Sequence, residues 1–134
     1  MAVWYAGRIL AVRQSYRPNP SWPGGGIHRG ETPREAARRE LAEELGLRVA
    51  AEDLVLVREI VSEWDFRHDH VRVFELHLAA EPRITIDNRE IVAARFVAPE
   101  ALLAAPGLAP FMREHLAALR ATARLNAPAA SGGR

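Results

Sequence analysis

Cysteine and lysine are both absent from this chain of 134 residues. Without cysteine the protein can form no disulfide, no thiolate metal site and no thiol nucleophile. All 18 basic residues are arginines, whose guanidinium binds phosphate in a bidentate manner that an ammonium group does not match. The formal net charge is only +1, so no broad basic field indicates general nucleic-acid binding.

Long apolar runs are missing as well. No stretch approaches the roughly 20 apolar residues of a membrane span, and no signal peptide pattern is present, so we expect a soluble, cytoplasmic protein with no membrane contact. With 134 residues, 49% of them hydrophobic, the chain can bury one substantial core. We therefore predict a single domain over residues 1–125. Residues 126–134, rich in alanine, glycine, serine and proline, are predicted to be a disordered tail.

The most informative segment is a glycine-rich turn followed by a helix. Gly24, Gly25 and Gly26 let the backbone turn sharply and approach a ligand closely. Thr32 is a good N-cap and stands three residues before Glu35, which is the spacing of a capping box, while a proline suits the first helical position. Gly46 tolerates the left-handed conformation that ends many helices. These signals predict a helix over Pro33–Leu45.

Three glutamates of this helix share one face. Glu40, Glu43 and Glu44 stand at i, i+3 and i+4, and their side chains therefore project together. Three acids on a helix are most often a solvated face, and each like-charge pair costs about 0.2–0.5 kcal/mol. A flexible glycine loop does not require a carboxylate cluster at a fixed distance, however. The combination favours a magnesium site beside a phosphate site.

The spacing of this segment resembles the signature box of the Nudix hydrolase family from Gly25 to Leu47. The matching positions are Gly25, Glu31, Arg39, Glu40, Leu41, Glu43, Glu44, Gly46 and Leu47. The resemblance implies an α/β/α sandwich with a mixed β-sheet and a loop-helix-loop catalytic box. It also implies hydrolysis, with Mg²⁺ or Mn²⁺, of the pyrophosphate bond in a nucleoside diphosphate linked to another moiety.

Site residues follow from the same resemblance. Glu40, Glu43 and Glu44 would bind the divalent cations, together with the carbonyl of Gly24. Arg39 would orient glutamate carboxylates, and Glu31 would be either an acid near the metals or a partner of Arg39.

The general base stays open, because the resemblance allows it to be an acid of the box or one far downstream. Glu43 and Glu44 are the candidates inside the box. Glu90, directly before a predicted strand, is the candidate outside it, with a solvated loop acid as the alternative interpretation.

Alternating and helical apolar patterns predict the remaining elements. A loop should span residues 14–23, with Trp22 packed in the core, and a hairpin turn should span residues 65–69. Phe111, His115, Leu116 and Leu119 should lie near the buried side of the last helix. Strands are predicted over residues 2–5, 8–13, 54–61, 70–78, 83–86 and 91–97, and helices over 99–105 and 110–125.

Four residues are candidates for substrate binding: Arg13, Tyr16, Arg17 and Trp64. The small-molecule substrate is expected to be a nucleoside triphosphate or, second, a nucleotide sugar such as ADP-ribose. The alternative is a nucleotide-binding sensor or adaptor domain that does not turn its ligand over. An exposed sheet edge near residues 1–5 would also allow a homodimer.

Overall fold

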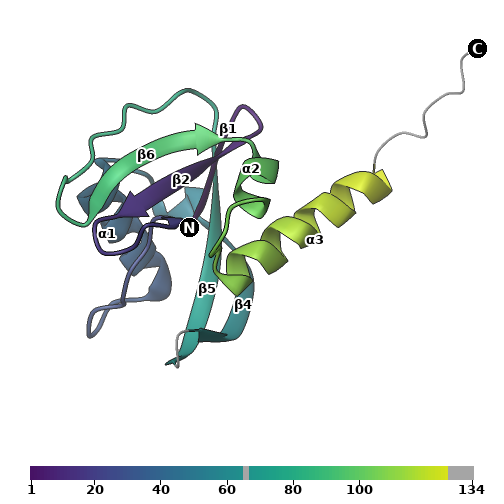
Figure 1. The fold of residues 1–134 in the computed structure, drawn as a ribbon. Coiled ribbons are helices and arrows are strands. Elements are labelled where there is room, and N and C mark those ends of the chain that lie inside the picture. Colours follow the sequence, from purple (N-terminus) through teal and green to yellow (C-terminus); the bar gives the residue numbers. More distant parts are fainter. Residues whose placement is uncertain (65–66, 127–134) are drawn as a thin grey trace, which may run out of the picture.

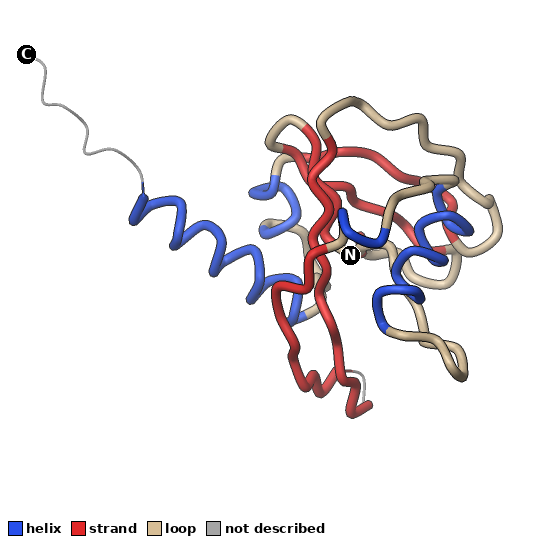
Figure 2. The backbone as a smooth tube through the Cα atoms, turned by 180° about the vertical axis from the view of Figure 1, so that it is seen from behind, coloured by secondary structure: helices blue, strands red, loops and turns tan. Residues whose placement is uncertain are grey.

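The computed structural model describes residues 1–64 and 67–126, with the side chains of residues 62–64, 67–69 and 124–126 left out of the description. A mixed sheet lies between α1 on one face and α2 and α3 on the other, as Figures 1 and 2 show. The predicted α/β sandwich is therefore confirmed. The strands are β1 (Ala2–Tyr5), β2 (Arg8–Gln14), β3 (Pro20–Ser21), β4 (Val55–Trp64), β5 (Arg67–Leu78) and β6 (Ile91–Val97), and the helices are α1 (Pro33–Leu45), η1 (Ala51–Asp53), α2 (Pro99–Leu103) and α3 (Pro110–Asn126).

The strand order is β3-β2-β1-β5-β4, and β6 pairs with β2 outside this path. Strands β1 and β5 run parallel, whereas the other pairs are antiparallel. Strand β1 thus lies inside the sheet, between β2 and β5. The expectation of an exposed edge at residues 1–5 is therefore wrong. A homodimer through that edge no longer has support from the sequence.

Helix α1 begins and ends where the local signals predict. The hydroxyl of Thr32 accepts a hydrogen bond from the backbone N–H of Glu35, whose carboxylate accepts one from the N–H of Thr32. Gly46 ends the helix with φ 66°, and its N–H donates to the carbonyls of Leu41 and Ala42. Both ends of α1 are therefore fixed by hydrogen bonds that the sequence encodes locally.

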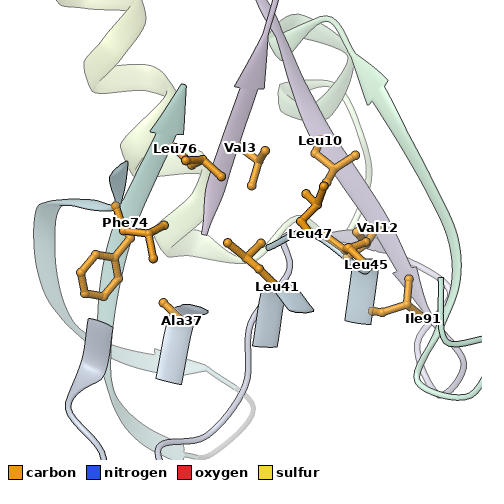
Figure 3. Close-up of a cluster of buried hydrophobic side chains, with 11 residues drawn as sticks. Val3, Leu10, Val12, Ala37, Leu41, Leu45, Leu47, Phe74, Leu76 and Ile91 are labelled. Carbon is orange, nitrogen blue, oxygen red and sulfur yellow. The ribbon is translucent and has the colours of Figure 1, made fainter. Parts of the chain in front are cut away.

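Each face of the sheet carries its own apolar cluster. Strand β2 alternates, so that Leu10 and Val12 face α1 while Ile9 and Ala11 face α2 and α3. Figure 3 shows Ala37, Leu41 and Leu45 of α1 pointing toward the strands. The buried core side chains of this layer fix α1 against the sheet, because apolar area removed from water contributes about 25 cal/mol per Å².

Strand β5 and helix α3 complete the second cluster. Val73 faces α3, whereas Phe74 and Leu76 face α1. His115 and Leu116 lie on the buried side of α3, also as expected. Trp22 is buried, and its ring packs edge-on against those of Phe111 and His115, which confirms its predicted place in the core.

Other boundaries differ from the prediction. Residues 20–21 form the short strand β3 inside the predicted loop, where they pair with Val12 and Arg13. Residues 83–86 are not a strand: the N–H of Thr85 donates to the carbonyl of Leu45 at the end of α1. The segment is therefore held by the end of α1, where the last backbone carbonyls have no partner inside the helix, and not by a neighbouring strand.

The hairpin and the C-terminal elements also shift. Strand β4 reaches Trp64 and β5 starts at Arg67, so residues 67–69 are strand instead of turn. Helix α2 stops at Leu103, two residues early, and α3 continues through Asn126, the first residue of the predicted tail. Residues 127–134, the rest of that tail, lie outside the described residues.

Candidate active site

The glycine turn closes over two carboxylates of α1. The backbone N–H of Gly24 donates to the carboxylate of Glu44 at 3.2 Å, and the side chains of both Glu40 and Glu44 are buried. A Cβ atom at Gly25 would lie 2.8 Å from the carboxyl carbon of Glu40. The absence of a side chain at Gly25 is therefore what lets the turn lie directly against Glu40.

Glu44 is the group with the most disturbed ionisation. Burial, and after it the charge of the nearby Glu40 carboxylate, raises the pKa of the Glu44 carboxyl to about 8. The hydrogen bond from Gly24 acts in the opposite direction, and Glu90 adds a smaller repulsive contribution. Two acids are thus packed together out of water with too little positive charge between them.

Arg39 organises the other carboxylates of the box. Its guanidinium contacts Glu31 through two nitrogens, at 2.8 and 3.0 Å, and also contacts Glu40 at 3.1 Å and Glu43 at 3.2 Å. A further bond, at 2.9 Å, runs to the carbonyl of Gly26. The hydrogen bond from Arg39 lowers the pKa of Glu31 to about 2, and in return Glu31 raises the pKa of Arg39. Glu31 lies where a partner of Arg39 was predicted.

A divalent cation fits the donor set of this site. Glu40 and Glu44 offer hard carboxylate oxygens in a confined space, and oxygen donors of this kind suit Mg²⁺. Glu44 forms no ion pair with any residue of the described chain, so a cation would supply the charge that it lacks. Glu43 differs from them, being exposed and turned to Arg39. Within residues 1–64 and 67–126 no group of three acidic or histidine side chains is arranged as a ready metal cluster.

The structure describes the side chains of three further predicted residues, Glu90, Tyr16 and Arg17. Glu90 is exposed, and its backbone carbonyl accepts a hydrogen bond from the N–H of Ser15 at 2.8 Å. Tyr16 is exposed, and the guanidinium of Arg17 stands 5.9 Å from the centre of its ring. The side chain of Trp64 lies outside the described residues. These contacts leave the substrate-binding roles as predictions.

A pocket of about 470 Å³ lies between β2, β6 and α2, and both Arg13 and Arg95 line it. Arg95 was not singled out in the sequence. The pairing of β6 with β2 places it, because Arg95 stands opposite Ala11 and Ala93 stands opposite Arg13. These pairs join residues 80 or more positions apart, so the alternating pattern of β6 was the only local signal of where Arg95 lies.

The α/β sandwich and the glycine turn over the carboxylates of α1 are the arrangement that the resemblance to Nudix hydrolases implied. The model of the NUDIX domain matches residues 2–119, so the chain belongs to the Nudix hydrolase family. This confirms the resemblance carried by residues 25–47. No helix in the described part of the chain is long and apolar enough to cross a membrane.

Solved structures agree with the fold. The chain is similar to the E. coli ORF135 protein, with 26% identity, a TM-score of 0.66 and coverage of 96% of this chain and 89% of the other. It is also similar to a C. elegans Ap4A hydrolase, with 20% identity, a TM-score of 0.71 and 92% of each chain covered. At that identity the second likeness shows the fold alone.

Among curated proteins, an RNA pyrophosphohydrolase of Cereibacter sphaeroides is 54% identical over 43 residues, which is 31% of this chain. The match spans only 26% of the length of that relative. The likeness is therefore local, and the activity of the whole relative does not transfer with it.

Proposed function

We propose that the protein hydrolyses the pyrophosphate bond of a nucleoside diphosphate linked to another moiety, with Mg²⁺ or Mn²⁺ as cofactor. The observation that carries the proposal is the buried pair Glu40 and Glu44 beneath the glycine turn, where the pKa of Glu44 is raised to about 8. Two ionised carboxylates buried side by side are unfavourable by themselves, and a bound cation makes their charged forms favourable.

Glu40 and Glu44 would hold the cation, and Glu43 would add a carboxylate at the rim. The bound metal would neutralise phosphate charge and lower the pKa of a water molecule. Arg39 keeps Glu40 and Glu43 in place through the contacts described above. The carbonyl of Gly24 stays a predicted further ligand.

Glu90 is the carboxylate that we assign as general base. Its charge contributes to the raised pKa of Glu44, so it lies within electrostatic reach of the site. Glu43 is engaged by Arg39, and Glu44 is engaged by Gly24. Glu90 makes neither of these contacts, so its side chain is available to accept the proton of the attacking water. Glu90→Gln should lower kcat with little change in KM.

The substrate classes follow from the sequence and from the relatives. Nucleoside triphosphates come first and nucleotide sugars such as ADP-ribose second. RNA and dinucleoside polyphosphates join the panel because similar proteins carry the names RNA pyrophosphohydrolase and Ap4A hydrolase.

The test is Mg²⁺-dependent turnover of this panel by the unmodified protein, by Glu44→Gln and by Glu52→Gln. Glu52 is an exposed glutamate of η1 and serves as the matched control. We expect hydrolysis of one class, reduced about a hundredfold or more in Glu44→Gln and unchanged in Glu52→Gln. Mg²⁺ binding without turnover of any compound would contradict the proposal and favour the nucleotide sensor.

A further inference from the structure

The segment between β5 and β6 carries Glu90 and passes the C-terminal turn of α1. There the backbone N–H of Asp87 donates to the carbonyl of Glu44 at 3.3 Å. Ile84 and Ile86, on the same segment, pack against the apolar cluster between α1 and the sheet. The chain therefore enters the loop of Glu90 from a point that is bonded to the backbone of Glu44.

The side chain of Asp87 holds the turn from this point to β6. Its Oδ1 atom accepts hydrogen bonds from the backbone N–H groups of Arg89 at 3.1 Å and of Ile91 at 2.9 Å. Burial opposes the ionised form of Asp87, but the N–H groups of residues 91, 89 and 90 outweigh it and lower the pKa of this carboxyl. The carboxylate thus binds backbone donors on both sides of Glu90.

The backbone on either side of Glu90 is fixed as well. Asn88 has φ 60°, a left-handed conformation that asparagine adopts more readily than most residues, and its N–H donates to the carbonyl of Ile91 at 3.1 Å. Ile91 is fully buried in the cluster beneath α1 (Figure 3). The N–H of Ser15, directly after β2, donates to the carbonyl of Glu90 at 2.8 Å. Glu90 is therefore an exposed side chain on a backbone that is bonded at several points.

Asp87 links the two acids whose distance matters for the reaction. Its N–H bonds to the backbone of Glu44, and its carboxylate bonds to the turn that carries Glu90. The charge of Glu90 is felt at Glu44, so the two carboxylates lie within electrostatic reach of each other. A displacement of about 1 Å of a catalytic group can lower a rate about a hundredfold.

We propose that Asp87 is a positioning residue for the general base: its carboxylate holds the turn so that Glu90 keeps a fixed place relative to Glu44. The inference rests on the proposed function for the role of Glu90. It adds a residue outside the box that acts through Glu90 and not on the substrate.

Three variants test the inference on the compound that the unmodified protein hydrolyses. Asp87→Ala removes both hydrogen bonds and should lower kcat about tenfold or more with little change in KM. Asp87→Asn should restore most of kcat, because both bonds go to one oxygen and the amide keeps an oxygen that accepts them. Asp53→Ala, at an exposed aspartate of η1, is the matched control and should leave kcat unchanged.

A double-mutant cycle with Glu90→Gln separates positioning from a general loss of structure. Asp87→Ala should lower kcat far less in the Glu90→Gln background than in the unmodified protein, because the group that it positions is already inactive. Equal effects in both backgrounds would overturn the inference. So would a kcat that Glu90→Gln leaves unchanged. Should Asp87→Ala fail to fold, Asn88→Val displaces the same turn by forcing a branched side chain into φ 60°, and the same cycle applies.

Amide hydrogen exchange of the metal-free protein, in excess EDTA, tests the loop without turnover. The amides of Arg89, Ile91 and Ser15 should exchange about tenfold or more faster in Asp87→Ala, and close to the unmodified rate in Asp87→Asn. Unchanged exchange at Ser15 would overturn the inference even if hydrolysis is found. Faster exchange combined with no hydrolysis of any compound would support the positioning by Asp87 and refute the proposed reaction.

Discussion

At the scale of single residues, charge is distributed unevenly over the glutamates of the box. Arg39 contacts the carboxylates of Glu31, Glu40 and Glu43. The fourth acid, Glu44, receives a backbone N–H instead of a guanidinium. The geometry of one arginine thus decides which acids have a cationic partner and which is left in need of a cation.

Glu44→Gln should stabilise the metal-free protein at neutral pH. Since the pKa of Glu44 is raised from 4.5 to about 8 on folding, the folded state holds a proton that the unfolded chain releases between these pH values. Stability from this group is therefore lost as pH rises through that window. The amide avoids the loss, and we expect a gain of about 1–2 kcal/mol at pH 8, reduced from the full linkage value because solvent screens part of the charge.

Urea unfolding of both proteins in EDTA, at pH 5 and pH 8, measures the effect. The difference should be small at pH 5 and favour the variant at pH 8. Added Mg²⁺ should raise the stability of the unmodified protein far more than that of Glu44→Gln. A variant less stable at pH 8 without metal would contradict the electrostatic account.

Gly25→Ala should damage catalysis more than folding. The added Cβ would lie 2.8 Å from the carboxyl carbon of Glu40, so this carboxylate must shift from its present position. We expect activity to fall about tenfold or more, because small displacements of a positioned group have effects of this size. The neighbouring Gly26→Ala, whose Cβ would meet nothing within 4 Å, is the matched control. Comparable losses in steady-state activity for both variants would refute the explanation.

At the scale of elements, α1 could be predicted from end to end, whereas the sheet could not. Thr32, Glu35 and Gly46 satisfy the ends of α1 with bonds inside a short segment, and such local chemistry is visible in a sequence. The place of β1 depends on pairing Ala2–Tyr5 with residues 75–78, and that partner choice has no local signal. Residues 83–86 alternate like a strand, but the backbone N–H of Thr85 donates to the carbonyl of Leu45 at the end of α1 instead of to a neighbouring strand.

In the site, too, local features could be predicted from the sequence and long-range contacts could not. Glu40, Glu43 and Glu44 could be predicted because they belong to one helix, as could the glycine turn that precedes them. The different surroundings of these three glutamates could not be predicted, since they arise from the contacts that Arg39 makes with Glu31 and Gly26 across the loop. Arg95 was missed for a related reason, because its neighbour Arg13 comes from another strand.

Thr32→Ala tests how far α1 depends on its cap. The variant loses the acceptor for the N–H of Glu35 and should lower the free energy of unfolding by about 1 kcal/mol. kcat should change little, because the buried face of α1 is untouched. Thr122→Ala, which removes a hydroxyl on the exposed side of α3, is the control for urea unfolding. A loss of activity without a loss of stability would show that Thr32 has a role beyond capping.

At the scale of the whole molecule, α3 is attached to the sheet by a polar contact as well as by apolar packing. The Nε2 atom of His115 lies 2.9 Å from the carboxylate of Glu75 on β5, and His115 is buried. The same carboxylate contacts the exposed His77 at 2.9 Å. Loss of this contact would leave α3 attached to the sheet by the apolar cluster alone, which also includes Trp22.

Glu75→Gln should therefore lower stability in a pH-dependent way. The hydrogen bond with His115 lowers the pKa of Glu75 below its ordinary value of 4.5, so the stabilisation is present above pH 4.5. It is lost as pH falls from there through the lowered pKa of the folded state. We expect the variant to be about 1 kcal/mol less stable at pH 7, given that this carboxylate is partly exposed to solvent, with the gap closing below pH 4.5. Urea unfolding between pH 3 and pH 7, with Glu52→Gln beside it, measures this difference. A gap that is constant with pH would mean that packing, and not the charge of Glu75, holds α3 to the sheet.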